Sequence, residues 1–142
     1  IEHMYGPKDD KNKFIYWLIN EMIHGKDPIN LTSGIQKRDF IYIDDVVSVF
    51  ELVLKKKGEL SNLNEFDLGT GNFHEVREFV LLIAKELEEK YNKKIIPRLN
   101  FGAIDYRESD IMTPELDNSK LIDLGWKSCF GIEEGIQKII KE

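Results

Sequence analysis

The sequence predicts one domain of the α/β class, in which short strands of a mixed sheet alternate with about five helices. Segments with the apolar spacing of helices alternate with short apolar segments typical of strands, which is the order that builds a sheet covered by helices. The chain has 142 residues, of which 42% are hydrophobic and 32% are charged. That composition suffices for one core and is too polar for a membrane protein. We therefore expect residues 1–142 to form a single domain.

The first half of the chain carries clear signals for its elements. The apolar residues of KFIYWLINEMI predict a helix over residues 13–23, and Gly25 ends it. Short apolar segments predict strands at 28–32 and 39–43. A helix follows to residue 57, and either Asp44 or Asp45 would make a good N-cap for it.

The second half continues the alternation up to a long irregular segment. Strands are expected at residues 64–68 and 95–100, and helices at 76–90, 118–124 and 132–141. The sequence FGAIDYRESDIMTPEL, residues 101–116, has no clear period. We expect it to be extended.

Charge and composition exclude several classes of function. The net charge of −6 comes from 20 Lys and Arg against 26 Asp and Glu, which argues against a broad grip on nucleic acid. No apolar stretch is long enough to span a membrane, and the first residues lack the order of a signal peptide. The single cysteine, Cys129, cannot form an internal disulfide and is expected in the core. It fits a reducing compartment, so we expect a cytoplasmic protein.

Two kinds of cofactor site receive little support from the residues. The segment EFDLGTGNFHEV has Gly69 and Gly71 before a helix, but His74 stands where a dinucleotide loop needs its third glycine. A tight turn between strand and helix is the better interpretation. The three histidines are scattered and Cys129 is alone, so no metal site is predicted. No cluster of serine, histidine and aspartate predicts a catalytic centre either.

The arginines are more informative because they are few. Arg38 and Arg107 lie at the edges of a strand and a loop, where a guanidinium can hold a phosphate with two hydrogen bonds. The alternative for each is a surface salt bridge, Arg38 with Asp39 and Arg107 with Asp110. The residues alone leave both interpretations open.

A family resemblance favours the first interpretation. The segments YGP, KFIYWLI, INLTSGIQKRDFIYIDDVV, FDLGTGN, YRESD and LDNSKLIDLGW resemble, in this order, the C-terminal portion of extended short-chain dehydrogenases/reductases that act on nucleotide sugars. UDP-galactose 4-epimerase, dTDP-glucose 4,6-dehydratase and the CDP-sugar synthases and epimerases are members. Each segment is weak by itself, but together they cover nearly the whole chain.

The resemblance implies roles for individual residues. Arg38 matches the arginine that contacts the diphosphate of the nucleotide sugar, and Asp44 or Asp45 matches the aspartate that caps the next helix. Arg107, with Asp110 and the later Asp117, Ser119 and Lys120, matches the second arginine and its motif. Two arginines that converge on one diphosphate would form an anion clamp.

The resemblance implies further substrate contacts at the start of the first helix, in the strand at 28–32 and at His3. Lys13 stands where relatives place a basic or polar residue near the phosphates, and Asn30, Leu31 and Thr32 match the strand along the nucleobase and ribose. His3 replaces an asparagine that contacts the substrate in the family. The implied partner is a nucleotide-sugar substrate, with neither nucleic acid nor membrane.

The family's cofactor and catalytic motifs are not found in this chain. The glycine-rich loop for NAD or NADP and the tyrosine and lysine spaced Y-x-x-x-K precede YGP in the family, and none of the five tyrosines here has a lysine four positions on. The resemblance therefore implies a substrate-binding portion without the dinucleotide-binding core. We expect no catalytic residue, no bound cofactor and no turnover from this chain alone, although the intact parent would use NAD or NADP for hydride transfer.

A second class of function remains open. The chain could be a binding or assembly module that keeps the architecture without the chemistry and pairs with a partner chain. Helices over Val46–Leu54 and Val76–Ala84 would then expose apolar faces and drive self-association, for example as a homodimer. Such a module would not need Arg38 or Arg107 free to bind anions, which separates the two hypotheses.

Overall fold

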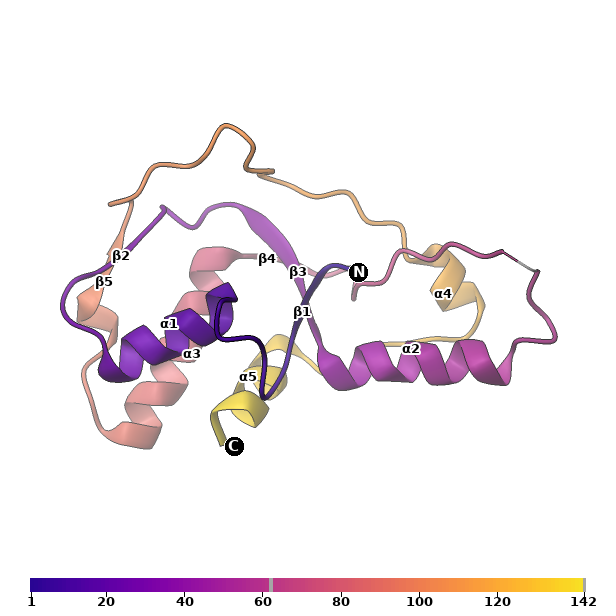
Figure 1. Cartoon of the computed structure of the whole chain (residues 1–142), viewed down its shortest axis with the longest axis horizontal. Coiled ribbons are helices and arrows are strands. Elements are labelled where there is room, and N and C mark those ends of the chain that lie inside the picture. Colours follow the sequence, from indigo (N-terminus) through magenta and orange to yellow (C-terminus); the bar gives the residue numbers. More distant parts are fainter. Residues whose placement is uncertain (62, 142) are drawn as a thin grey trace.

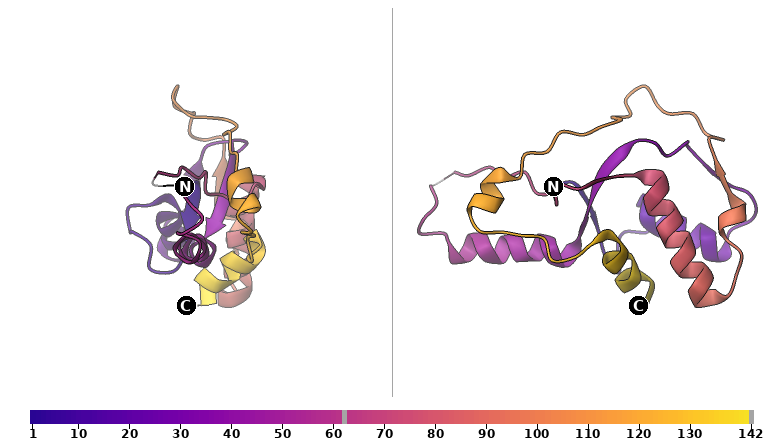
Figure 2. Two further views of the ribbon diagram at one scale, coloured as in Figure 1. Left: turned by 90° about the vertical axis from the view of Figure 1, so that its right-hand side faces the viewer. Right: turned by 180° about the vertical axis from the view of Figure 1, so that it is seen from behind.

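A computed structural model describes residues 1–61 and 63–141 of the chain. Figures 1 and 2 show an elongated molecule in which α1, α3 and α5 gather at one end and α2 and α4 lie at the other. The helices of the described part are α1 (Phe14–His24), α2 (Ile43–Lys55), α3 (Val76–Tyr91), α4 (Ser119–Asp123) and α5 (Ile132–Lys141), and a short 3-10 helix covers Ile96–Arg98. The strands are β1 (His3–Tyr5), β2 (Ile29–Leu31), β3 (Lys37–Tyr42), β4 (Phe73–Glu75) and β5 (Leu99–Phe101).

The strands form two small sheets. In the first, β3 is the central strand: β1 pairs with it in parallel, with His3 opposite Phe40, and β4 pairs antiparallel to its first half. In the second, β2 and β5 pair in parallel, with Ile29 opposite Leu99. The predicted α/β class with short mixed strands is confirmed, and the long segment after β5 arches from this second sheet to α4 (Figure 1).

Strand β3 separates two hydrophobic clusters because successive side chains of a strand point to opposite faces. Phe40 and Tyr42 belong to a cluster that we call the α1/α3/α5 core, where the ring of Phe40 stacks on Phe79 at a centroid distance of 3.9 Å. In this core Tyr5 is 1% exposed and its hydroxyl donates a 3.3 Å hydrogen bond to the Ile132 carbonyl.

The opposite face of β3 supports a smaller cluster, the α2/α4 core. Ile41 is fully buried there, between α2 and the short α4. The other buried members are Val46, Val49, Leu68, Leu121 and Trp126. One strand therefore serves two cores, and its residues 38 and 40 share the face of the α1/α3/α5 core.

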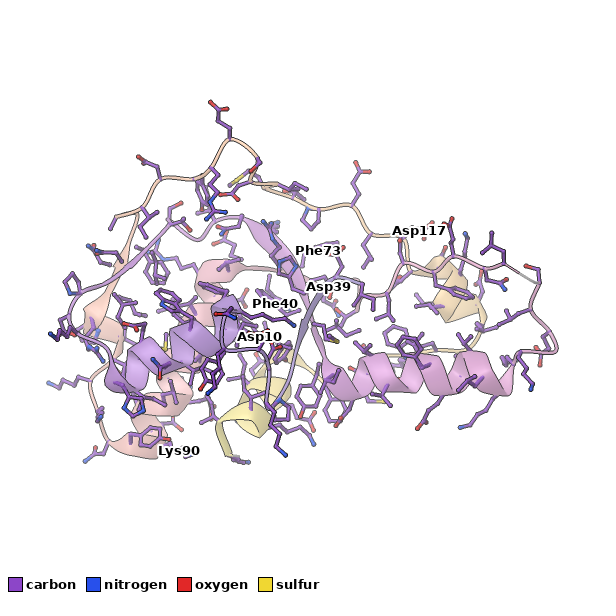
Figure 3. All side chains as sticks on the ribbon, viewed as in Figure 1. Asp10, Asp39, Phe40, Phe73, Lys90 and Asp117 are labelled. Carbon is purple, nitrogen blue, oxygen red and sulfur yellow. The ribbon has the colours of Figure 1, made fainter. Side chains whose placement is uncertain are left out.

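Two buried aspartates, Asp39 in β3 and Asp45 in α2, hold distant segments in place. Figure 3 shows Asp39 and Phe40 on opposite sides of β3. The fully buried Asp39 carboxylate accepts hydrogen bonds from the Thr70 hydroxyl (2.8 Å) and the N–H groups of Thr70 (3.0 Å) and Gly71 (2.6 Å). A side chain at Gly69 would come within 2.9 Å of this carboxylate, and Gly71 has a φ of +82°, so both positions require glycine.

Asp45 has a role other than the expected helix cap. The N-cap of α2 is Tyr42, and no side chain caps the helix, so the prediction for Asp44 or Asp45 is wrong. The Asp45 carboxylate is 1% exposed and instead accepts hydrogen bonds from the N–H groups of Cys129 (2.7 Å) and Phe130 (3.1 Å). It thereby ties α2 to the approach to α5.

Most predicted helices agree with the structure, but several strands do not. Helices at 13–23, 76–90 and 132–141 are confirmed to within about a residue, and 118–124 contains the shorter α4. The predicted strand at 64–68 is wrong, and β1 and β4 were missed. The segment 95–100 holds a 3-10 turn before β5, and the glycine turn at 69–72 leads to β4 before α3 begins. Cys129 is exposed and not in the core.

The two long helices differ in how much apolar surface they leave exposed. On α3, Phe79, Val80, Ile83, Ala84 and Leu87 are all buried in the α1/α3/α5 core. On α2, Val46 and Val49 are buried, whereas Val47 is 47%, Phe50 58% and Leu54 69% exposed. The apolar face that was expected to be exposed on both helices is therefore exposed on α2 and buried on α3.

Candidate functional site

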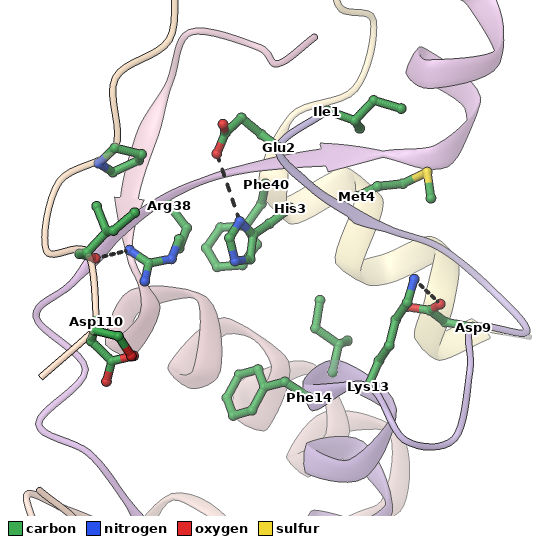
Figure 4. A pocket seen from close by; sticks show the side chains of 14 residues that line it. Ile1, Glu2, His3, Met4, Asp9, Lys13, Phe14, Arg38, Phe40 and Asp110 are labelled. Atoms are coloured by element: carbon green, nitrogen blue, oxygen red, sulfur yellow. Dashed lines mark hydrogen bonds and ion pairs between the residues drawn. The ribbon is translucent and has the colours of Figure 1, made fainter. Parts of the chain in front are cut away.

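Two adjoining pockets open beside β3. The first, of about 750 Å³, lies between the N-terminal strand β1, the start of α1 and residues 109–114 (Figure 4). The second, of about 390 Å³, lies between β2, α3, β5 and residues 104–110. Both pockets share the side chains His3, Phe14, Arg38, Phe40 and Asp110. The pockets are therefore two compartments of one site.

The structure brings together all seven residues that the sequence indicated for substrate binding. His3 and Arg38 line both pockets, Lys13 lines the first, and Arg107 lines the second. The remaining three, Asn30, Leu31 and Thr32, also line the second pocket. Asp117 and Lys120 of the related motif lie elsewhere: Asp117 accepts a hydrogen bond from the Ser119 N–H at the start of α4, and the Lys120 ammonium reaches the Glu65 carbonyl.

The guanidinium of Arg38 is oriented by backbone carbonyl groups. Its Nη1 donates 2.6 Å hydrogen bonds to the carbonyl oxygens of Lys37 and Ile111. The alternative salt bridge with Asp39 is not formed, because Asp39 points to the opposite face of β3. Within residues 1–61 and 63–141 no carboxylate neutralises Arg38, so its positive charge is available to a ligand.

The side chain of Arg107 is exposed and forms neither a hydrogen bond nor an ion pair with any residue that the structure describes. The alternative salt bridge with Asp110 is absent: the Asp110 carboxylate accepts a 2.9 Å hydrogen bond from the Arg107 backbone N–H instead. Residues 107–110 are thus held by hydrogen bonds of the Arg107 backbone to Asp110. The guanidinium of Arg107 remains free at the second pocket.

His3 packs against the wall that both pockets share. Its ring meets the Phe40 ring edge-on, at a centroid distance of 6.0 Å, and its Nδ1 lies 3.9 Å from the Glu2 carboxylate (Figure 4). Burial lowers the pKa of His3, and the positive charge of Arg38 lowers it further, whereas Asp39 opposes the shift. Neutral imidazole is therefore favoured, with one nitrogen as a donor and the other as an acceptor.

The other predicted residues already have partners inside the chain. The Lys13 ammonium lies 2.8 Å from the Asp9 carboxylate, and the Asn30 side chain accepts a hydrogen bond from Asn100. The Leu31 carbonyl oxygen accepts from the N–H groups of Gly102 (3.0 Å) and Ile104 (3.2 Å). Leu31 thus fastens the segment after β5 over the second pocket, a role that the sequence did not indicate.

Several further residues of the site were missed. Trp17 and Phe101 add aromatic rings to the second pocket, and Gln36 adds an amide. Tyr106 lies beside it, hydrogen-bonded to Ser33, Ile35 and Gln36. The helical period placed Trp17 on a buried face, yet it is 39% exposed. The one local signal for Tyr106 was its position next to Arg107.

The described residues contain neither a metal-binding cluster nor a membrane-spanning helix. No three histidine, cysteine, aspartate or glutamate side chains of this part of the chain come close enough to hold a metal ion. Among its helices, none is both long and apolar enough to cross a membrane. The arrangement is suited to binding an anion with aromatic and amide groups attached.

Comparisons with known proteins point to one group of enzymes. Residues 1–69 match the model of the NAD dependent epimerase/dehydratase family. The CDP-abequose synthase of Salmonella muenchen is 37% identical over 140 residues, which are 99% of this chain and 45% of the synthase. The dTDP-D-glucose 4,6-dehydratase of Mus musculus is 32% identical over 142 residues, 98% of this chain and 38% of that enzyme.

Solved structures give the same result for the fold. UDP-glucose 4-epimerase from Thermotoga maritima, with UDP-glucose, has a TM-score of 0.75 at 25% identity, and the match covers 99% of this chain and 43% of the epimerase. UDP-N-acetylglucosamine 4-epimerase from Methanobrevibacter ruminantium, with UDP-N-acetylmuramic acid, has a TM-score of 0.77 at 23% identity, with coverages of 99% and 43%. The chain spans less than half the length of the relatives it matches.

Proposed function

The chain corresponds to the C-terminal portion of extended short-chain dehydrogenases/reductases of the NAD-dependent epimerase/dehydratase family, and we propose that it binds a nucleotide sugar by its diphosphate. Arg38 and Arg107 would hold the diphosphate at the second pocket. His3 and Lys13 would face the neighbouring first pocket, where the sugar would lie.

One observation carries this proposal: two arginines without carboxylate partners line the same pocket of a chain with a net charge of −6. In an acidic protein an arginine normally finds a carboxylate, and leaving two of them unpaired at one cavity suits an anionic ligand. The Arg38 guanidinium is already oriented by two carbonyl groups, so little conformational entropy would be lost on binding.

The lining of the second pocket suits a nucleoside. Trp17 and Phe101 offer aromatic surface to a base, and Gln36 and Thr32 offer polar groups beside it. Related enzymes are described with UDP-glucose and with UDP-N-acetylmuramic acid bound. The identity of the base is the first thing that a binding experiment would establish.

The residues present do not fit a dinucleotide cofactor. Among the described residues, the turn with Gly69 and Gly71 donates its N–H groups to the Asp39 carboxylate, where a pyrophosphate would need them free. We therefore assign NAD or NADP to a part of the enzyme outside this chain; a related dTDP-glucose 4,6-dehydratase is described in complex with NAD. That part would supply the hydride transfer, and this chain would hold the sugar in position for it.

A non-catalytic assembly module is the second candidate. The exposed apolar residues of α2, Val47, Phe50 and Leu54, favour it because they would be covered by a partner chain. A module of this kind gives no reason for two unpaired arginines at one pocket, and so anion binding discriminates between the candidates.

The test is ligand-observed NMR of this chain with UDP-, dTDP-, GDP- and CDP-glucose and with NAD. We expect saturation transfer to at least one nucleotide sugar and none to NAD. Arg107→Ala should reduce it strongly with no change in fold, because the Arg107 side chain forms no hydrogen bond or ion pair with a described residue. Arg38→Ala should also reduce it strongly, although this change removes the hydrogen bond to the Ile111 carbonyl as well.

Lys57→Ala is the matched control, because it removes one exposed positive charge at the far end of α2. Unchanged binding in this variant would exclude a general effect of net charge. Signals of wild-type strength in Arg107→Ala and Arg38→Ala would contradict the proposed clamp, and transfer to NAD would contradict the assignment of the cofactor.

A further inference from the structure

Tyr106 is a second anchor of the site, and the resemblance gave it no role although it begins the segment YRESD. Its hydroxyl donates a 2.7 Å hydrogen bond to the Gln36 side-chain oxygen and accepts one of 3.0 Å from the Ile35 N–H. It also lies 2.8 Å from the Ser33 hydroxyl. One phenol therefore joins the segment before β3 to the segment that carries Arg107, more than 70 residues away in sequence.

The segment that carries Arg107 is fastened on both sides of that residue. Before it, the N–H groups of Gly102 and Ile104 bind the Leu31 carbonyl. After it, the Ile111 carbonyl binds Arg38, and the Lys37 N–H donates a 2.7 Å hydrogen bond to the Met112 carbonyl. Tyr106 supplies the remaining fixed point, directly beside Arg107. Without its hydroxyl, residues 105–110 would have no side-chain hydrogen bond to the segment before β3 among the described residues.

We propose that Tyr106 positions Arg107: its hydroxyl fixes the arginine at the second pocket before an anion binds. This inference rests on the proposed function, since it concerns the same anion site. It adds a residue that would touch no ligand, because Tyr106 is not among the residues that line either pocket. Its contribution would be preorganisation, which lowers the entropy lost when Arg107 closes on the ligand.

The state of the phenol agrees with this role. Burial opposes ionisation of Tyr106, but the hydrogen bonds from Ser33 and the Ile35 N–H outweigh it, so the pKa of Tyr106 is lowered. The hydroxyl is thus held by donors as well as by its acceptor, Gln36. A hydroxyl with three hydrogen-bond partners is an anchor between the two segments.

A double-mutant cycle tests the inference. The dissociation constants of the wild type, Tyr106→Phe, Arg107→Ala and the double variant would be measured for UDP-, dTDP- and CDP-glucose by titration calorimetry. Arg107→Ala should weaken binding about tenfold or more, as expected for loss of a charge-assisted pair of hydrogen bonds. Tyr106→Phe should weaken it about three- to tenfold alone and less than about twofold in the Arg107→Ala background.

A general structural role of Tyr106 would give the same Tyr106→Phe effect on affinity in both backgrounds, and a smaller effect in Arg107→Ala is what distinguishes the positioning role. A Tyr106→Phe effect of equal size in both backgrounds would overturn the inference, because Tyr106 would then act without Arg107. Wild-type affinity in Tyr106→Phe would overturn it as well, while leaving the proposed function intact. Tyr91→Phe, an exposed tyrosine at the end of α3, is the matched control and should bind as the wild type does.

A ligand-free measurement keeps the two proposals separate. In Tyr106→Phe the N–H of Ile35 should exchange faster, and ¹⁵N relaxation should show larger motion over residues 105–110. If the wild type binds no nucleotide sugar, the proposed function fails for this chain, and these data alone decide about Tyr106. Unchanged order of residues 105–110 in the variant would then overturn the positioning role.

Discussion

The two sides of β3 are built from the same kinds of residue but differ in how completely they are closed. On the α1/α3/α5 side, three helices cover Phe40 and Tyr42, and Phe79, Ile83 and Leu87 of α3 are buried. On the α2/α4 side, Ile41 is fully buried, yet α2 leaves Phe50 58% and Leu54 69% exposed beside its buried residues. The first side is the more complete of the two, and the rings that α1 leaves partly exposed there include Phe14 and Trp17, which line the second pocket.

The more complete side holds the candidate ligand site, and the less complete side is suited to contact another surface. Both pockets lie where β3 faces the α1/α3/α5 core, so the more complete side is the one that carries the unpaired arginines. A rigid core keeps such groups in position. On the less complete side, the exposed stripe of α2 is the feature that a covering surface would explain. The predictions below test this division, beginning with the largest effect.

Two buried leucines provide the most direct comparison. Leu87 in α3 is 1% and Leu121 in α4 is 0% exposed. We expect Leu87→Ala to lower the free energy of unfolding by about 4 kcal/mol and Leu121→Ala by about 2–3 kcal/mol, because the five-residue α4 can move into the space left behind. Urea denaturation gives both values. Equal losses would show that the two sides are packed equally tightly.

The carboxylate of Asp45 joins the two sides, so its loss should affect both. We expect Asp45→Ala to cost about 3 kcal/mol of unfolding free energy, because it leaves the N–H groups of Cys129 and Phe130 without their acceptor. Asp45→Asn should cost less, since its amide oxygen can still accept. Asp44→Ala, one residue earlier and exposed, is the control and should change stability by less than about 0.5 kcal/mol. A small effect at Asp45 would mean that the sides are held together by other contacts.

The exposed stripe of α2 should affect association and not stability. We expect the double variant Phe50→Ser, Leu54→Ser to unfold within about 0.5 kcal/mol of the wild type. The wild type should self-associate as its concentration rises, and the variant should remain monomeric, as measured by sedimentation velocity. Leu63→Ser removes an apolar side chain that is 83% exposed elsewhere and should not alter association. A wild type that is monomeric at every concentration would exclude self-association through this stripe.

The smallest effect concerns His3, on the more complete side. Since burial and then the charge of Arg38 lower the pKa of His3, an NMR titration should give a midpoint below the ordinary 6.5. Arg38→Gln should move that midpoint upward. As the pH falls through 6.5, the unfolded chain takes up the proton first, so stability should decline slightly, by little because the side chain is 52% exposed. A midpoint that does not respond to Arg38→Gln would show that the two groups do not interact.

The sequence was sufficient wherever the relevant signal is local. Helical periods gave α1, α3 and α5, and the short motifs around Arg38 and Arg107 named residues that line one site. Strands β1 and β4 escaped prediction because their three residues, HMY and FHE, include polar side chains that give no strand signal, and they become strands only against β3.

The function of the buried carboxylates could not be read from neighbouring residues. The groups that bind Asp39 lie 31 and 32 residues away, and one that binds Asp45 lies 84 residues away. A helix cap was the best local explanation for Asp45, but tertiary contacts replaced it. Tyr106 was overlooked for the same reason, since its partners are about 70 residues distant.

The hydrogen bond between Tyr5 and Ile132 has a consequence for how the chain acquires its shape during synthesis. These two residues are 127 positions apart, and β2 must likewise wait for β5. Contacts of such long range fold slowly, and a ribosome adds only about 5–20 residues per second. For several seconds the nascent chain would expose the apolar residues of α1 and β3, and the two pockets would form only after residues up to Pro114 have emerged.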